Sequence, residues 1–351
     1  MSTAPTLLPV GELARMLGAQ ASSLARELLP GGRREGHEWR VGSLAGEPGR
    51  SLAVHLDGPK AGIWADFSAD QRGDALDLVA AVLFAGDKRR AIDWARRWLG
   101  LDGGDPARIE QARRRVARAR EDHADEAVAA EKRRRQAQAL WLAGKPVLDT
   151  PAEAYLAARG IRLRAFAHVP NAIRFHPACW CAEVKGELPA MVTAIGDRDG
   201  RHAATHRTYL AEIDGVWRKA NLQTPKKVLG SLGGGYVRLT RGAAGTPWRD
   251  LAGTEVVAFT EGIENALAVA SLVPEWRTAA AGSLAQLGRV VLPGALREAV
   301  ICCDNDAGNE AAQAALRAAV VHFQRQGVLV RLARPRDGVK DWNDELLADD
   351  E

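Results

Sequence analysis

Short apolar runs alternate with amphipathic segments along residues 251–351. Apolar runs with the length of buried strands are EVVAFT at 255–260, RTAAAG at 277–282, EAVICC at 298–303 and VLVRLARP at 328–335. Segments with helical spacing of apolar residues are EGIENALAVASL at 261–272 and NEAAQAALRAAVVHFQRQG at 309–327. This β-α-β-α-β order predicts an α/β domain with a parallel central sheet and flanking helices.

Residues 150–250 show a different pattern, in which strands follow one another directly. TPAEAYLAARGI at 150–161 predicts a short helix that ends at Gly160. AMVTAIGDRDGRHAATHRTYL at 190–210 predicts a hairpin that turns at DRDG. NLQTPKKVLGSLGGGYVRLT at 221–240 places basic residues beside a glycine-rich turn. These features predict an α+β subdomain with a basic character.

The chain begins with a small mixed pattern over residues 1–103. VGELARMLGAQASSLARELLP at 10–30 predicts a helix ending before Gly31. HEWRVGSL, RSLAVHLDG and GIWADF predict strands, and GDALDLVAAVLF and AIDWARRWLG predict two helices. Residues 104–149 are rich in Ala, Arg and Glu and predict a charged helical linker. Such a helix is held by ion pairs four residues apart, and the alternative is a basic ridge that contacts phosphates.

Composition narrows the functional classes. The 351 residues are 46% hydrophobic and 26% charged, with a net charge of +4, which is typical of a globular protein and compatible with a nucleic-acid partner. No apolar run reaches the roughly 20 residues needed to cross a bilayer, and the first residues lack the pattern of a signal peptide. We therefore expect a cytoplasmic protein without a membrane partner. The four cysteines do not form a disulfide framework, and no GxxxxGK[ST] loop indicates a helicase ATPase.

Three acidic residues directly follow two of the predicted strands. Glu261 follows VVAFT, and Asp304 and Asp306 follow AVICC. Ligands of open parallel sheets bind beyond the carboxyl ends of the strands, and residues two apart in an extended chain face the same side. Clustered carboxylates repel one another unless a cation lies among them, and Mg²⁺ is the natural occupant. Helix capping by Asp306, with Asn309, and by Glu261 is the alternative. For the set of three we favour a metal site that supports phosphoryl transfer.

The segments TEGIENALA and ICCDNDAGNEAA resemble the Toprim domain, a fold shared by bacterial replicative primases, topoisomerases and some nucleases. The resemblance implies that Glu261, Asp304 and Asp306 are catalytic and bind Mg²⁺ or Mn²⁺. KDWND at 340–344 resembles the motif that closes this domain in phage-type primases. It implies that Asp341 and Asp344 support a second metal and that Lys340 neutralises phosphate.

The middle segments HRTYL and RKANLQTPKKVLGSLGGGYVRL resemble the basic half of the primase core, which precedes Toprim. The resemblance implies that Lys226 and Lys227 meet the incoming nucleotide, and that Arg207 and Lys219 lie on the same basic face. Surface residues beside a loop are the alternative.

GIWADFSADQRGDALDLV resembles part of a primase zinc-binding module, but residues 1–100 contain no cysteine. His37 and His55 alone cannot complete a four-ligand zinc site, so we expect a zinc-free relative. We expect Trp39, Trp64 and Phe67 in the core of this small domain, and stacking on bases is the alternative. Elsewhere, candidates with poor zinc spacing are His176, Cys179 and Cys181, while Cys302 and Cys303 are expected in the core.

The sequence therefore predicts a primase-like Toprim protein of phage, prophage or plasmid type. It is expected to make short RNA primers on a single-stranded DNA template from ribonucleoside triphosphates, with a separate replicative helicase as a candidate partner. Two alternatives stay open. One is a Toprim nuclease that uses water as the nucleophile, and the other is a non-catalytic nucleic-acid-binding accessory protein of replication.

Overall fold

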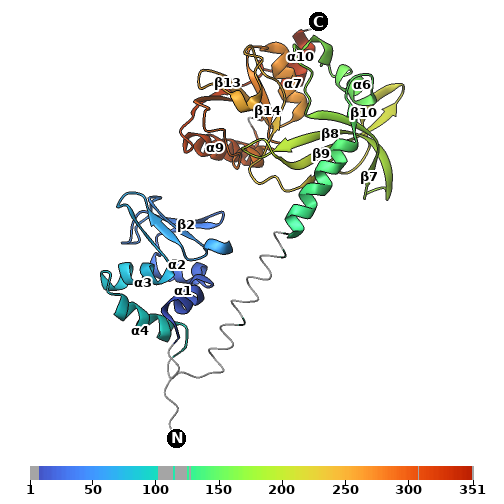
Figure 1. The fold of residues 1–351 in the computed structure, drawn as a ribbon. Coiled ribbons are helices and arrows are strands. Elements are labelled where there is room, and N and C mark those ends of the chain that lie inside the picture. The colour runs from blue at the N-terminus through green and yellow to red at the C-terminus, as the bar shows by residue number, and fades with distance from the viewer. Residues whose placement is uncertain (1–7, 102–113, 115–124, 126–127, 307, 350–351) are drawn as a thin grey trace. The chain divides into compact units, whose positions relative to one another are not determined.

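A computed structural model describes residues 8–101, 114, 125, 128–306 and 308–349 (Figure 1). The chain divides into two compact units, Met1–Val128 and Ala129–Glu351. Most of the predicted linker helix before residue 128 lies outside the described residues. The described residues 128–143 are helical, and from Ala129 onward they belong to the second unit.

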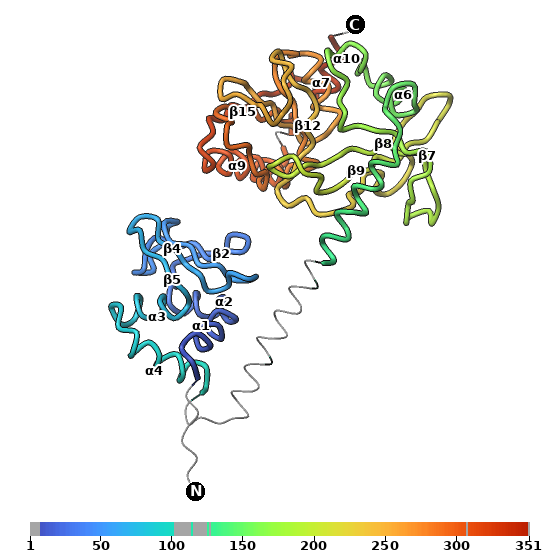
Figure 2. The backbone as a smooth tube through the Cα atoms, viewed as in Figure 1, coloured from blue at the N-terminus to red at the C-terminus, as the bar shows by residue number. Residues whose placement is uncertain are grey.

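In its described residues 8–101, the N-terminal unit packs α-helices α1 to α4 beside a five-stranded antiparallel sheet (Figure 2). Its helices are α1 Val10–Gly18, α2 Ala21–Leu28, α3 Ala75–Phe84 and α4 Lys88–Trp98. Its strands, in sheet order, are β1 Arg33–Glu35, β2 Glu38–Val41, β3 Leu52–His55, β4 Trp64–Asp66 and β5 Gln71–Gly73.

Two sequence expectations for this unit need correction. The single helix predicted over 10–30 is two helices, and the first ends at Gly18, where an added Cβ would lie 2.5 Å from the carbonyl oxygen of Ala61. This close approach leaves no room for a side chain at position 18. Trp39 and Trp64 are buried in the core, as expected, but Phe67 is 73% exposed and takes no part in that packing.

The second unit begins with an antiparallel sheet that follows the helix over 128–143. Its elements are β6 Lys145–Pro146, α6 Pro151–Ala157, β7 Ile173–Cys181, β8 Gly186–Gly196, β9 His202–Ile213, β10 Val216–Lys219 and β11 Lys226–Gly230. The strand order is β10-β9-β8-β7-β6, and β11 also pairs with β9. The predicted hairpin is therefore present as β8 and β9.

A second sheet contains the predicted parallel strands. Its elements are β12 Val237–Arg238, β13 Val256–Thr260, α7 Ile263–Leu272, β14 Arg277–Ala280, α8 Leu284–Leu287, β15 Glu298–Cys302, α9 Glu310–Gln324, β16 Leu329–Ala333 and α10 Trp342–Asp349. The order is β12-β14-β13-β15-β16, in which β13 to β16 are parallel. The antiparallel edge strand β12 comes from before residue 251, so this sheet recruits a strand across the predicted domain boundary.

The two sheets of the second unit share one core. Buried side chains from both meet in a single cluster that includes Tyr155, Met191, Ile263 and Leu346. A backbone bridge between Gly196, the last residue of β8, and Tyr236, the residue before β12, joins the two sheets. The helix over 128–143 packs on the antiparallel sheet through Leu140 and Trp141, against a cluster that holds the buried Cys179 and Cys181. No helix in the described ranges has both the length and the apolar content of a membrane span.

Candidate active site at the edge of the parallel sheet

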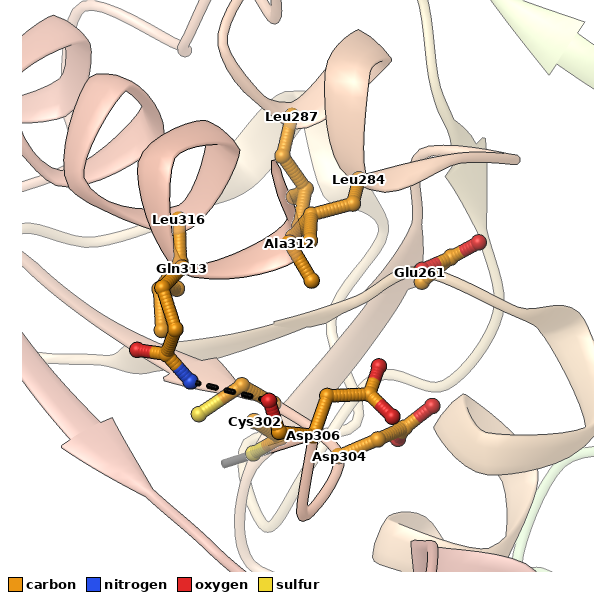
Figure 3. A pocket seen from close by; sticks show the side chains of 10 residues that line it. Glu261, Leu284, Leu287, Cys302, Asp304, Asp306, Ala312, Gln313 and Leu316 are labelled. Carbon is orange, nitrogen blue, oxygen red and sulfur yellow. Dashed lines mark hydrogen bonds between the residues drawn. The ribbon is translucent and has the colours of Figure 1, made fainter. Parts of the chain in front are cut away.

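The strands β13 and β15 are neighbours, and this brings the three predicted acids together. Thr260 at the end of β13 pairs in register with Cys302 at the end of β15. Glu261 and Asp304 therefore leave the sheet at the same edge, and Asp306 follows two residues later. Figure 3 shows the three carboxylates around one pocket, which Leu284, Leu287 and Gln313 also line.

The pocket concentrates negative charge. Burial raises the pKa of Asp304 to about 6, and the carboxylates of Asp341, Glu261 and Asp306 add to the rise. Asn265 opposes it by donating a hydrogen bond of 2.9 Å to Oδ1 of Asp304. Burial also raises the pKa of Glu261, with Asp306 contributing, while Lys226 acts in the opposite direction. The mutual repulsion expected from the sequence is therefore present.

The capping alternative does not account for these acids. The side chain of Asn309 caps α9 by accepting from the backbone N–H of Ala312 at 3.1 Å. Gly262 occupies the cap position of α7, with no side-chain hydrogen bond there. Asp306 contacts the start of α9 through its carbonyl oxygen, which accepts from Gln313 Nε2 at 3.3 Å (Figure 3). Both carboxylates line the pocket, and that of Glu261 also accepts a hydrogen bond from the backbone N–H of Leu284 at the start of α8.

The donor set fits a hard divalent cation. All the charged ligands on offer are carboxylate oxygens, which Mg²⁺ and Mn²⁺ prefer. Across the described part of the chain, however, no group of three or more His, Cys, Asp or Glu side chains is closed tightly enough to hold a metal. The carboxylates would have to move closer together to coordinate one cation.

The closing motif contributes unequally to this pocket. The carboxylate of Asp341 raises the pKa of Asp304. It also accepts hydrogen bonds from the backbone N–H groups of Asn343 and Asp344 at 2.9 and 3.0 Å, and these bonds fix the start of α10. Asp344 is exposed and does not line the pocket. Lys340 is exposed as well, and its carbonyl oxygen accepts from the backbone N–H of Asn305.

Asn305 is a positioning residue that sequence reasoning missed. Its side-chain Nδ2 donates to the carbonyl oxygens of Val339 at 2.6 Å, Arg336 at 3.1 Å and Pro335 at 3.3 Å. These bonds tie the loop carrying Asp304 and Asp306 to the segment before α10. The available signal was its place between two acids. The triplet is a tight turn rather than an extended segment, because the backbone N–H of Asp306 donates to the carbonyl oxygen of Asp304 at 3.0 Å.

Replacing Asn305 with Ala is expected to loosen this loop. We expect a loss of about 1–2 kcal/mol in the free energy of unfolding, because three carbonyl groups lose their donor. Weaker Mn²⁺ binding should accompany it, measured by calorimetric titration. Asn309→Ala is the matched control, because it removes the α9 cap at a similar stability loss of about 1 kcal/mol without freeing the segment 335–340. Equal Mn²⁺ affinities in the two variants would contradict the positioning role.

A buried carboxylate, Glu264, connects the basic sheet to this site. Its side chain is 5% exposed, and its oxygens lie 3.1 Å from Nζ of Lys219 and 3.3 Å from Nζ of Lys226. The hydroxyl of Tyr155 donates to it at 2.7 Å. Burial alone would raise the pKa of Glu264, but the two ammonium groups outweigh it and hold the pKa well below its usual range. The sequence offered no sign of this role, since Glu264 looked like an ordinary residue in the first turn of a helix.

The four predicted basic residues lie on two faces of the antiparallel sheet. Lys226 pairs with Thr208 and Lys227 pairs with Arg207, and adjacent residues of a strand point to opposite faces. Lys226 and Lys219 reach Glu264, whereas Arg207 donates to the carbonyl oxygen of Trp180 at 3.4 Å on the other side. The expectation of one shared basic face was therefore wrong. The pairing register of β9 with β11 determines on which face of the sheet each basic side chain lies.

Comparison with known proteins identifies part of the chain. Residues 256–350 match the Toprim domain, and residues 131–239 match a domain of unknown function. None of the curated proteins matches.

The solved structures that the chain matches include primases. The Aquifex aeolicus primase, with its zinc-binding and RNA polymerase domains, is 16% identical over 97% of this chain and 81% of that one, with a TM-score of 0.35. The E. coli primase catalytic core is 16% identical over 63% and 76%, with a TM-score of 0.39. The primase fragment of the bacteriophage T7 primase-helicase protein is 13% identical over 86% and 91%, with a TM-score of 0.34.

The assignment rests on the Toprim match, because it covers the elements that carry the acidic pocket. The matched residues run from β13 to α10 and include Glu261, Asp304 and Asp306. Residues 256–350 of this chain are therefore a Toprim domain.

Proposed function

We propose that this protein is a primase-like nucleotidyltransferase that synthesises short RNA primers on single-stranded DNA during phage or plasmid replication. The observation that carries the proposal is the acidic pocket at the edge of the Toprim sheet. The ammonium group of Lys226, on the neighbouring antiparallel sheet, lowers the pKa of Glu261 in this pocket. Glu261, Asp304 and Asp306 would hold Mg²⁺ or Mn²⁺. Such ions supply Lewis-acid stabilisation of the charge that develops on the transferred phosphoryl group.

The lysines beside the pocket supply the complementary charge. Glu264 neutralises one of the two ammonium groups that it contacts, so the pair of Lys219 and Lys226 keeps one net positive charge, and of the two Lys226 acts on Glu261. Burial lowers the pKa of Lys219 despite the contact with Glu264. Fixed cations of this kind favour the triphosphate of an incoming ribonucleotide and orient it without reorganisation. Lys227 and Arg207, on the other face, are proposed to contact the strand rather than the triphosphate.

The test is a primer-synthesis assay on single-stranded DNA with labelled ribonucleotides and either Mg²⁺ or Mn²⁺. We expect short labelled products that disappear in Glu261→Gln. Metal-dependent loss of the template without any product would instead establish the nuclease. If the protein binds the template but neither reaction occurs, even when a replicative helicase is added, the result would favour a non-catalytic accessory protein.

The affinity of the pocket for a divalent cation is expected to depend on pH. Asp304 binds a cation only when ionised, and its pKa is raised to about 6. Protons therefore compete with the cation as the pH falls through about 6, and Mn²⁺ affinity should rise from pH 5 to pH 7 and level off above it. Titration of Mn²⁺ by electron paramagnetic resonance measures this dependence. A pH-independent affinity over this range would contradict it, and Asp304→Asn should flatten the profile.

A further inference from the structure

The two oxygens of the Glu264 carboxylate have different partners. Oε1 accepts a hydrogen bond of 2.7 Å from the hydroxyl of Tyr155 and lies 3.1 Å from Nζ of Lys219. Oε2 lies 3.3 Å from Nζ of Lys226. Tyr155 and Lys219 therefore hold one oxygen, and the other oxygen holds Lys226.

This carboxylate is a fixed counterion, whereas Lys226 is able to move. The side chain of Glu264 is 5% exposed, and the fully buried Tyr155 on α6 sets its orientation. Lys226 is 37% exposed and carries its ammonium group on a flexible four-carbon stem. If Oε2 no longer attracts this ammonium group, it can turn to another carboxylate within its reach.

The second carboxylate within reach of Lys226 is that of Glu261. Gly262 separates Glu261 from α7, and a Cβ added to Gly262 would lie 3.6 Å from Oε2 of Glu264. The oxygen that holds Lys226 therefore lies beside the backbone of the residue that follows Glu261. Burial raises the pKa of Glu261, and Lys226 opposes this rise, as expected for a cation close to the carboxylate.

An ammonium group in the acidic pocket would compete with a divalent cation. The carboxylates of Glu261, Asp304 and Asp306 line this pocket (Figure 3), and a neighbouring ammonium group relieves their repulsion when no metal is bound. That group must leave before a metal ion can bind Glu261. The apparent affinity for the metal therefore falls by the fraction of molecules in which the pocket is free. Glu264 offers Lys226 a partner outside the pocket.

We propose that Glu264 is a positioning residue that holds Lys226 outside the acidic pocket and thereby keeps Glu261 available to a divalent cation. The inference rests on the metal site of the proposed function, but it requires no primer synthesis. It also distinguishes two effects of one side chain. All three contacts of Glu264 contribute to stability, whereas the contact with Lys226 controls access of the metal to the pocket.

Glu264→Gln tests this role, because an amide can keep the partners of one oxygen and lose the partner of the other. With the amide oxygen in the place of Oε1, Tyr155 keeps its acceptor, and the amide NH₂ group faces Lys226, which is also a donor. We expect Mn²⁺ to bind about ten-fold more weakly than to the wild type, which corresponds to an ammonium group in the pocket of roughly nine molecules in ten. Electron paramagnetic resonance titration at pH 8, without nucleotide or nucleic acid, measures this affinity.

Removal of each lysine in the same background separates positioning from simple loss of charge. Glu264→Gln with Lys226→Met should bind Mn²⁺ within about three-fold of the wild type, because no ammonium group can then enter the pocket. Glu264→Gln with Lys219→Met is the matched control, since it restores the same net charge but leaves Lys226 free. Its affinity should remain about ten-fold weaker than that of the wild type. If the loss came only from the missing negative charge of Glu264, both lysine substitutions would restore binding equally.

A variant that keeps Glu264 makes the test independent of any stability lost in Glu264→Gln. Lys226→Met alone should raise the Mn²⁺ affinity by about three-fold or less, because Glu264 already holds the ammonium group outside the pocket. A gain of about ten-fold or more would mean that Lys226 occupies the pocket in the wild type, and this result would overturn the proposal. Thermal unfolding of each variant in EDTA establishes that folded protein is titrated.

The outcomes distinguish this inference from the proposed function. Equal Mn²⁺ affinities of Glu264→Gln and the wild type, or equal rescue by the two lysine substitutions, would overturn the positioning role even in a protein that makes primers. Rescue by Lys226→Met alone, in a protein that makes no primer, supports the positioning role and contradicts only the proposed function. Mn²⁺ binding that Glu261→Gln leaves unchanged would contradict both.

Discussion

Asp304→Asn is expected to reduce primer synthesis by about 10²–10³-fold or more while stabilising the metal-free protein. In the wild type, Asn265 Nδ2 donates to Asp304 Oδ1 at 2.9 Å. The amide of the variant keeps an oxygen that can accept this hydrogen bond, so the local geometry is retained. It removes the negative charge that a cation requires and that Glu261, Asp306 and Asp341 repel. Activity and stability should therefore change in opposite directions, as at many functional sites.

The size of the stability gain follows from the pKa of Asp304. The ordinary pKa of an aspartate carboxyl is 3.8, and that of Asp304 is about 6 in the folded chain. A raised pKa means that the folded state is penalised whenever this group is ionised, so the penalty is full above pH 6 and disappears as the pH falls toward 4. Solvent screening of this half-buried group leaves an expected gain of about 1–2 kcal/mol at pH 8.

Urea unfolding of both proteins at pH 8 and pH 4 in EDTA measures this gain. The advantage of Asp304→Asn should be present at pH 8 and absent at pH 4, and saturating Mn²⁺ should stabilise only the wild type. A metal-free variant less stable than the wild type at pH 8 would contradict the repulsion described for this pocket.

Glu264→Ala is expected to lower the free energy of unfolding by about 3 kcal/mol or more. The substitution removes the acceptor of the hydroxyl of the buried Tyr155. It also removes the carboxylate that Lys219 and Lys226 both contact. The two lysines then repel each other inside the unit. Glu264→Gln should lose less, about 1–2 kcal/mol, because the amide oxygen still accepts from Tyr155.

The pH dependence of this contribution has the opposite sign to that of Asp304. The pKa of Glu264 is lowered in the folded state, so its stabilisation is present above the unfolded value near 4.5 and is lost as the pH falls below it. Urea unfolding at pH 7 and pH 3 measures the difference between wild type and Glu264→Gln. Glu212→Ala, at an exposed position on β9, is the matched control and should change stability by less than about 0.5 kcal/mol. A loss in Glu264→Ala no larger than that of the control would show that the buried ion pairs contribute nothing.

The alternation of strands and helices in residues 251–351 was sufficient to predict the parallel sheet and the acids at its edge. Strand-length apolar runs that alternate with helices of regular apolar spacing are compatible with few sheet topologies. Connections between parallel strands are nearly always right-handed, which reduces the number of possible topologies further. The position of Glu261, Asp304 and Asp306 after strand ends followed from the same pattern. These are local properties, since each depends on residues that are near one another in the chain.

Tertiary structure decided which of these residues meet. The neighbouring positions of β13 and β15 bring Glu261 to Asp304, and the register of β9 with β11 turns Lys226 toward Glu264 and Lys227 away. Glu264 and Lys226 lie 38 residues apart in the chain. Their contact depends on how two sheets pack, and no spacing along the sequence encodes it. The sequence by itself determined the acids and their sheet, while the packing of the second sheet determined which cations face them, because side-chain direction in a strand alternates with every residue and only pairing selects the face.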